Sequence, residues 1–161
     1  MDNSDLHFSL VAISNSFMER QTTDKILACN KELGKYGLAL TEQQALALAQ
    51  TRTNALKENK RIELNSSVVD KLVLAFCDSP YIKNDTYEDT LHEIINLFYY
   101  LKNDTWDTIS DDGIIEFIKT AFNSRCHGSI ELLSGEALRL SEHIRSGKTL
   151  NTFKEGGNGI A

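Results

Sequence analysis

The sequence predicts an all-α protein, a single compact domain of six to seven helices arranged as about three helical hairpins. The 161 residues contain a single proline, Pro80, and most of the chain divides into segments with apolar residues at helical spacing. Residues that favour helix N-caps precede several of these segments. The length suits one domain with a substantial core, and 41% hydrophobic and 25% charged residues are ordinary for a globular protein.

The first quarter of the chain predicts two helices. Residues 6–18 fit both a helical stripe and strand alternation, and we favour the helix. Thr22 or Thr23 is then the expected N-cap of a helix over 23–34. We expect this second helix to end where two glycines follow, because glycine readily adopts the left-handed conformation past a helix C-terminus.

The next helix has the clearest start in the sequence. Thr41 and Gln44 match a capping box, in which each side chain bonds the backbone N–H of the other residue. This pattern predicts a helix over 41–59. The alternation of polar and apolar residues over 61–64 then indicates an extended segment, which is either a connector or a minor strand.

Two helices flank the single proline. Apolar spacing predicts the first over 67–77, and Pro80 stops it because proline disfavours helical torsions in the residue before it. The second covers 86–103 and carries apolar residues almost all round its last turns. A helix of that kind is usually central in its domain or faces a partner.

Two further helices complete the predicted domain. Serine caps and apolar stripes predict them over 110–124 and 128–146. The remainder is glycine-rich near its end and has no apolar stripe, so we expect it to be disordered. The predicted boundaries are therefore a helical domain over 1–146 and a disordered tail over 147–161.

The helices form three consecutive pairs that repeat at about 45 residues, a period typical of two-helix repeats. A regular stack of hairpins is therefore one arrangement that the sequence allows. Helical stripes resemble one another by chance, however, and we favour a compact bundle. The pairs are 23–34 with 41–59, 67–77 with 86–103, and 110–124 with 128–146.

Charge and cysteine content argue against several classes of protein. The net charge is −6, and an acidic chain without concentrated lysine and arginine is unsuited to phosphate backbones or anionic membranes. The amino-terminal residues lack the basic start of a secretory signal, and no apolar run approaches the roughly 18 residues of a membrane span. Three cysteines without close pairing argue against a disulfide scaffold. We expect a cytoplasmic protein with no nucleic-acid and no membrane partner.

Four short phrases of the sequence resemble those of a family of uncharacterised small bacterial proteins, a domain of unknown function. The resemblance covers roughly residues 20–146. It implies a bacterial origin, and it assigns no catalytic residue to this chain because the family has no assigned activity. The phrases are AFCDSPYI at 75–82, NDTW at 103–106, ISDD at 109–112 and GSIELL at 128–133.

The best candidate for a metal site lies on the predicted 86–103 helix. Glu88, Asp89 and His92 are spaced so that all three side chains share one helical face. Di-metal sites in helical bundles use such motifs on two helices together with two more carboxylates. This chain offers the motif once, which is half a site, and a solvated polar face is the simpler interpretation.

Other candidate groups also have simpler explanations. Cys126 and His127 suggest a nucleophile with its base, but adjacent residues rarely orient for that chemistry, and a half-buried cysteine at a turn is favoured. Trp106 is the only tryptophan. In a connection between helices it most often covers the helix ends as part of the core, whereas an exposed Trp106 would indicate an interface anchor.

No catalytic pattern stands out, so the leading hypothesis is a cytoplasmic protein-interaction or accessory protein that acts through a helical surface. Tyr99, Tyr100 and Trp106 are the candidate contact residues, in a homodimer or with another protein. We expect no cofactor and lean against enzyme activity. The alternative is a metal-dependent enzyme that uses the carboxylate and histidine site on the 86–103 helix.

Overall fold

The computed structural model describes the backbone of residues 3–158 and the side chains of residues 16–156. The regular structure in that range is helical, without a strand, so the predicted all-α fold class is confirmed. No helix in the same range is long and apolar enough to cross a membrane. The α-helices of eight or more residues are α1 (Asn3–Ala28), α3 (Glu42–Glu58), α4 (Val69–Phe76), α5 (Tyr87–Asp104), α6 (Asp111–Asn123), α7 (Ile130–Arg145) and α8 (Leu150–Asn158). The short α2 (Asn30–Leu33) and the 3₁₀ helix η1 (Gly34–Tyr36) follow α1.

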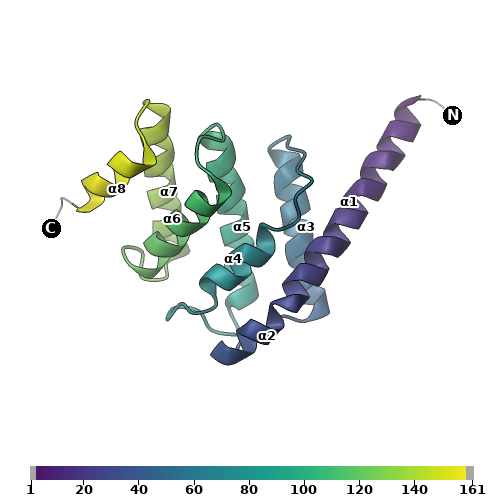
Figure 1. Ribbon diagram of the computed structural model, residues 1–161, viewed down its shortest axis with the longest axis horizontal. Helices are drawn as coiled ribbons and strands as arrows, with labels where there is room; N and C mark the ends of the chain where they lie inside the picture. Colours follow the sequence, from purple (N-terminus) through teal and green to yellow (C-terminus); the bar gives the residue numbers. More distant parts are fainter. Residues whose placement is uncertain (1–2, 159–161) are drawn as a thin grey trace.

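The helices lie in two layers (Figure 1). α3, α5 and α7 stand side by side in one layer, and α1, α4 and α6 form the other. Each helix contacts the other member of its pair and the helix of its own layer in the next pair. Within residues 3–158 the first pair has no extensive contact with the third. The three predicted hairpins are therefore present, and they stack in order along the molecule instead of closing into one bundle.

The loops between successive pairs follow one edge of this stack. The connections after α3, α5 and α7 all lie along the upper edge in Figure 1, whereas the connections within pairs lie along the lower edge. Loops far apart in the sequence thus become neighbours. This placement decides which side chains can form a common surface.

α1 differs from the two helices predicted for the first quarter of the chain. It is one helix through Ala28, which confirms helix over strand for the backbone of residues 6–18, but Thr22 and Thr23 are inside it and do not cap a second helix. The Thr23 hydroxyl donates to the carbonyl of Glu19 at 2.7 Å, within its own helix. Threonine can bond either a following N–H as a cap or a preceding carbonyl inside a helix, so the residue type did not distinguish the two.

The other predicted helix boundaries agree with the structure. The Gln44 N–H donates to Thr41 Oγ1 at 3.1 Å and the Thr41 N–H donates to Gln44 Oε1 at 2.9 Å, which completes the capping box. The hydroxyls of Ser110 and Ser129 each accept from the N–H three residues later, at 3.1 and 3.2 Å. Gly37 follows η1 with a φ of 73°, the left-handed conformation expected of a helix-ending glycine.

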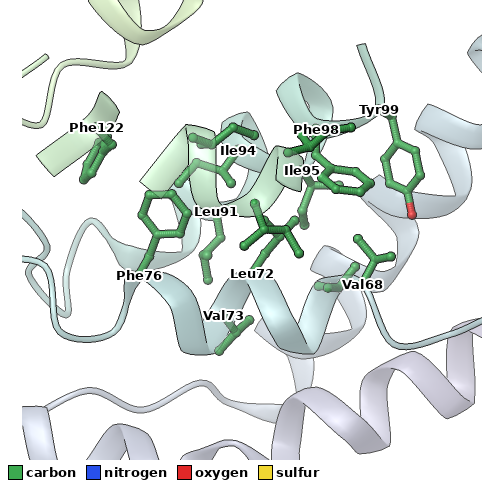
Figure 2. Packing of buried hydrophobic residues seen from close by; sticks show 14 of the residues in the cluster. Val68, Leu72, Val73, Phe76, Leu91, Ile94, Ile95, Phe98, Tyr99 and Phe122 are labelled. Carbon is green, nitrogen blue, oxygen red and sulfur yellow. The ribbon is translucent and has the colours of Figure 1, made fainter. Parts of the chain in front are cut away.

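α5 lies at the centre of the hydrophobic core, as its apolar circumference predicted. It contacts α3, α4, α6 and α7. Figure 2 shows Leu91 and Ile94 beside Phe76 of α4, with Phe122 of α6 completing the cluster. The Phe76 and Phe122 rings meet edge to face with centroids 5.3 Å apart. All six of the following residues on the apolar stripes of the predicted helices are buried: Phe76, Ile94, Phe98, Phe117, Ile118 and Leu133.

The C-terminal segment differs from the disordered tail predicted over 147–161. Residues Leu150–Asn158 form α8, and Phe153 is buried with its ring centroid 5.8 Å from that of Phe117. The segment has glycines near its end, but Leu150 and Phe153 are three residues apart and contact the body from one helical face. Residues 159–161 lie outside the described part of the chain.

Candidate functional site

The residues predicted to bind a metal lie on α5, and two of them contact each other. His92 Nε2 is 2.9 Å from Glu88 Oε2, and His92 Nδ1 is 2.6 Å from Thr51 Oγ1 on α3. Both ring nitrogens therefore have protein partners. Asp89 is exposed. Among residues 16–156 no three His, Cys, Asp or Glu side chains come together as metal ligands would. The metal site stays a prediction, while the contact with Thr51 joins α3 to α5.

The three predicted contact residues lie in different environments. Tyr99 is fully buried in the core, so it is not part of an exposed surface of this chain. Tyr100, the next residue of α5, is 36% exposed. Trp106, in the loop after α5, is 65% exposed and does not cover the helix ends. The exposure of Trp106 favours the interface-anchor interpretation over the core interpretation.

The hydroxyl of Tyr99 instead contacts a buried arginine. Arg52 of α3 is 2% exposed, and its Nε donates to the Tyr99 hydroxyl at 3.2 Å. Burial raises the pKa of Tyr99 to about 12, although the nearby Arg52 charge opposes that shift. Arg52 Nη2 also donates to the carbonyls of Asn65 at 2.6 Å and of Glu63 at 3.5 Å. The guanidinium therefore anchors the backbone of the extended segment after α3 to the core.

A chain of ion pairs joins the loop after α3 to the loop after α5. Arg61 donates from both terminal nitrogens to Asp107, at 3.0 and 2.5 Å. Lys102 Nζ lies 2.6 Å from Glu63 and 2.9 Å from Asp111. Burial lowers the pKa of Lys102, but its bonds to Glu63 and Asp111 raise it more, and the net shift is upward. The hydrogen bond from Arg61 lowers the pKa of Asp107.

Next to this ionic network, three apolar side chains face solvent. Ile62 is 91% exposed and Leu64 is 78% exposed, while Trp106 contributes the third. Among residues 16–156 these are the most exposed large apolar side chains. Because the Arg61–Asp107 pair joins their two loops, they belong to one region of the surface. We call this region, residues 61–66 with 105–107, the loop edge.

The turn that presents Trp106 has an unfavourable backbone. Trp106 and Asp107 have φ values of 56° and 57°, in the left-handed region that residues other than glycine rarely adopt. The Trp106 N–H donates to the carbonyl of Asn103 at 3.1 Å, and the Asp107 N–H donates to that of Lys102 at 3.0 Å. The turn thus closes the end of α5 and directs a large apolar side chain outward, against the usual preference of both residues.

Ile62 and Leu64 were not predicted as candidate contact residues. The alternation over 61–64 did predict an extended segment, and the structure has a connector there without regular secondary structure. Arg61 and Glu63 are half-buried in the ionic network, so the two intervening apolar side chains face away from it. The alternation was the available signal, but it does not say which of the two faces is covered.

The cysteines have no sign of activation. Cys29, Cys77 and Cys126 are buried free thiols. Burial raises the pKa of Cys29 to about 11, and it also raises the pKa values of Cys77 and Cys126. A raised pKa disfavours the reactive thiolate. His127, next to Cys126, has its Nδ1 3.3 Å from the Tyr81 hydroxyl.

Comparison with known proteins identifies the family of the chain and no activity. The family of unknown function DUF6323 matches residues 25–150, and the chain belongs to this family. The match includes α2 to α7 in full and thus the whole loop edge. No curated protein and no solved structure matches the chain. The resemblance to an uncharacterised family is therefore confirmed, while the bacterial origin that it implied stays a prediction.

Proposed function

We propose that this member of the family DUF6323 is a cytoplasmic protein-interaction protein that binds a protein partner through the loop edge. The exposure of Ile62, Leu64 and Trp106 on neighbouring loops is the observation that carries the proposal. Single exposed apolar residues are common on soluble proteins, but apolar residues gathered at one place mark interaction sites. Tryptophan is also enriched among the residues that dominate binding energy.

Covering the apolar side chains of the loop edge would contribute favourable free energy to binding. Covering an aliphatic or aromatic side chain such as Ile62 or Leu64 contributes about 1.5–3 kcal/mol. Ordering mobile loops on association would offset part of that gain. Here the loops are already fixed by the Arg61–Asp107 pair and by the bonds of Arg52 to the backbone, so little ordering would remain.

The cysteines support the cytoplasmic part of the proposal. All three are free thiols in the structure, and each is buried among apolar residues. Disulfides are rare in a reducing cytoplasm, where buried cysteine serves as a small apolar residue.

The backbone of the loop edge suggests how a partner binds. The carbonyls of Glu63 and Asn65 face Arg52. Successive carbonyls of an extended chain point to opposite edges, so those of Ile62 and Leu64 face away from the core. The N–H and carbonyl groups of Ile62 and Leu64 make no hydrogen bond within the described residues. An extended segment of a partner would satisfy them by strand addition.

A second copy of the chain is the simplest partner for this edge. Antiparallel pairing about a two-fold axis at Glu63 places Ile62 of one copy opposite Leu64 of the other, twice, with both residues using their free backbone groups. Opposed glutamates ordinarily destabilise a strand pair. In each copy, however, Glu63 already pairs with Lys102 and Arg61, so its charge is offset.

Light scattering over a range of protein concentrations tests this proposal. We expect wild type to approach twice the monomer mass, and Ile62→Lys with Leu64→Lys to remain monomeric because charges on an edge strand oppose pairing. Leu46→Lys and Leu138→Lys are matched controls, since these leucines are 41% and 50% exposed and lie outside the loop edge. A wild type that stays monomeric, or controls that dissociate equally, would contradict self-pairing.

A further inference from the structure

A second candidate site lies at the other end of the stack, against α7 and α8. It is a pocket of about 430 Å³, within the range of about 300–1,000 Å³ that small-molecule sites occupy. Three cationic side chains line it, Arg125 from the loop after α6, Arg139 from α7 and Lys148 from the loop after α7. Ser146 and Thr152 line the same space. The pocket therefore gathers hydrogen-bond donors, and it does not overlap the loop edge.

The two arginines are held in place by groups beneath them. Arg139 Nη1 lies 2.9 Å from one carboxylate oxygen of Glu136, and Arg125 Nη1 lies 3.4 Å from the other. Both guanidinium groups lie over the ring of Phe153, 5.9 and 6.0 Å from its centroid. A guanidinium has five N–H donors, and these contacts use one nitrogen of each. The remaining donors are available to a ligand without rearrangement of the pair.

The charge of the pocket favours an anion. Arg125, Arg139 and Lys148 supply three positive charges, and Glu136 and Glu142 supply two negative charges, which leaves one positive charge on a chain of net charge −6. Glu136 is largely enclosed by the two arginines that it orients, with a side-chain exposure of 14%, whereas Glu142 is exposed. An anionic ligand would therefore meet the cationic side chains directly, while solvent screens the acid at the surface.

We propose that this pocket binds a small molecule that carries a phosphate group. Arginine pairs suit phosphate because their planar N–H donors match its oxygens, and Lys148 adds a third charge at the same place. The Ser146 and Thr152 hydroxyls donate to the carbonyls of His143 and Thr149, at 2.7 and 2.9 Å, so the cationic side chains supply the donors for the ligand. The volume exceeds that of a bare ion, so the phosphate belongs to an organic molecule.

Calorimetric titration of the full chain with pyrophosphate, in a buffer of low ionic strength, tests the pocket. We expect binding that Arg139→Gln weakens about tenfold or more, because a charge-assisted bond is lost. Lys148→Gln should also weaken it, and since Lys148 is exposed this variant should fold normally. Arg145→Gln is the matched control, on the same helix and outside the pocket, and should leave the affinity unchanged within about twofold.

Three results would overturn this inference. Absence of pyrophosphate binding is the first, and equal loss in the Arg139→Gln and Arg145→Gln variants is the second, because that loss would reflect general charge alone. Tighter binding of citrate than of pyrophosphate is the third, since it would assign the pocket to carboxylates. The oligomeric state of the same variants is measured separately, so failure here leaves the proposed function of the loop edge unaffected.

Discussion

The buried hydrogen bond between Arg52 and Tyr99 decides how the loop edge is built. The sequence predicts Tyr99 and Tyr100 together at a surface, because a helix that is apolar almost all round does not reveal which side is covered. The structure buries Tyr99 and makes its hydroxyl a partner of Arg52. A lone arginine in the sequence gives no sign that tertiary contacts will bury it, so this contact was not predictable from residue types.

Removal of the Tyr99 hydroxyl tests that contact. We expect Tyr99→Phe to lower the free energy of unfolding by about 1–3 kcal/mol, because it leaves a buried charged donor of Arg52 without its acceptor. Tyr100→Phe, which alters a 36% exposed residue on the same helix, should change it by less than about 0.5 kcal/mol. Urea denaturation of both variants measures the difference, and equal stabilities would refute the role of the hydroxyl.

Trp106 has an exposed side chain and an unfavourable backbone. Its replacement therefore tests whether this side chain stabilises the fold. A left-handed conformation costs a residue other than glycine roughly 1–2 kcal/mol. Trp106→Gly removes that cost and increases the entropy of the unfolded chain, so we expect the free energy of unfolding to stay the same or rise by up to about 1 kcal/mol.

A buried aromatic residue would behave differently from Trp106 in the same thermal or chemical unfolding experiment. Phe98→Ala should lower the free energy of unfolding by about 3–5 kcal/mol, because Phe98 is fully buried. A loss of that size in Trp106→Gly would show that Trp106 stabilises the core and would remove it from the loop edge.

At the scale of the elements, helix starts were predicted better than helix connections. The caps at Thr41, Ser110 and Ser129 depend on local hydrogen bonds, which a short stretch of sequence specifies. The continuity of α1 across Thr22 and the packing of Phe153 in α8 depend on neighbours distant in the sequence. Those contacts have no local signature, so the threonine residue type misled the first expectation and the glycine content misled the second.

The turn between α6 and α7 depends on a glycine for two reasons. Gly128 has a φ of 79°, and a Cβ there would overlap the side chain of Tyr81. We therefore expect Gly128→Ala to lower the free energy of unfolding by about 2–5 kcal/mol, from the left-handed strain and the overlap together.

A second glycine provides the control for this turn. Gly135 lies within α7 with no heavy atom within 4 Å of an added Cβ, so Gly135→Ala should raise the free energy of unfolding by about 0.5–1 kcal/mol. Thermal unfolding of both variants gives the comparison. Similar effects of the two substitutions would contradict the described turn.

For the whole molecule, the stacking of pairs explains why the candidate site was only partly predictable. The repeat of helix pairs was visible in the sequence, but the period does not say whether pairs stack or close into a bundle. Stacking brings the loops after α3 and α5 to one edge, where Arg61 and Asp107 meet although they are 46 residues apart. Trp106 was identified from its type and position, whereas Ile62 and Leu64 became candidates only through this neighbourhood.

The central claim, that the loop edge binds a protein, is tested most directly by site-specific photo-cross-linking of the full chain in cells. A photoreactive amino acid replaces Ile62, Leu64 or Trp106, and in control variants it replaces Leu46 or Leu138. We predict one discrete cross-linked species of the same mass from all three loop-edge positions and from neither control, whether it contains a second copy or another protein. Absence of a product at the loop edge, or the same products from the controls, would contradict the claim.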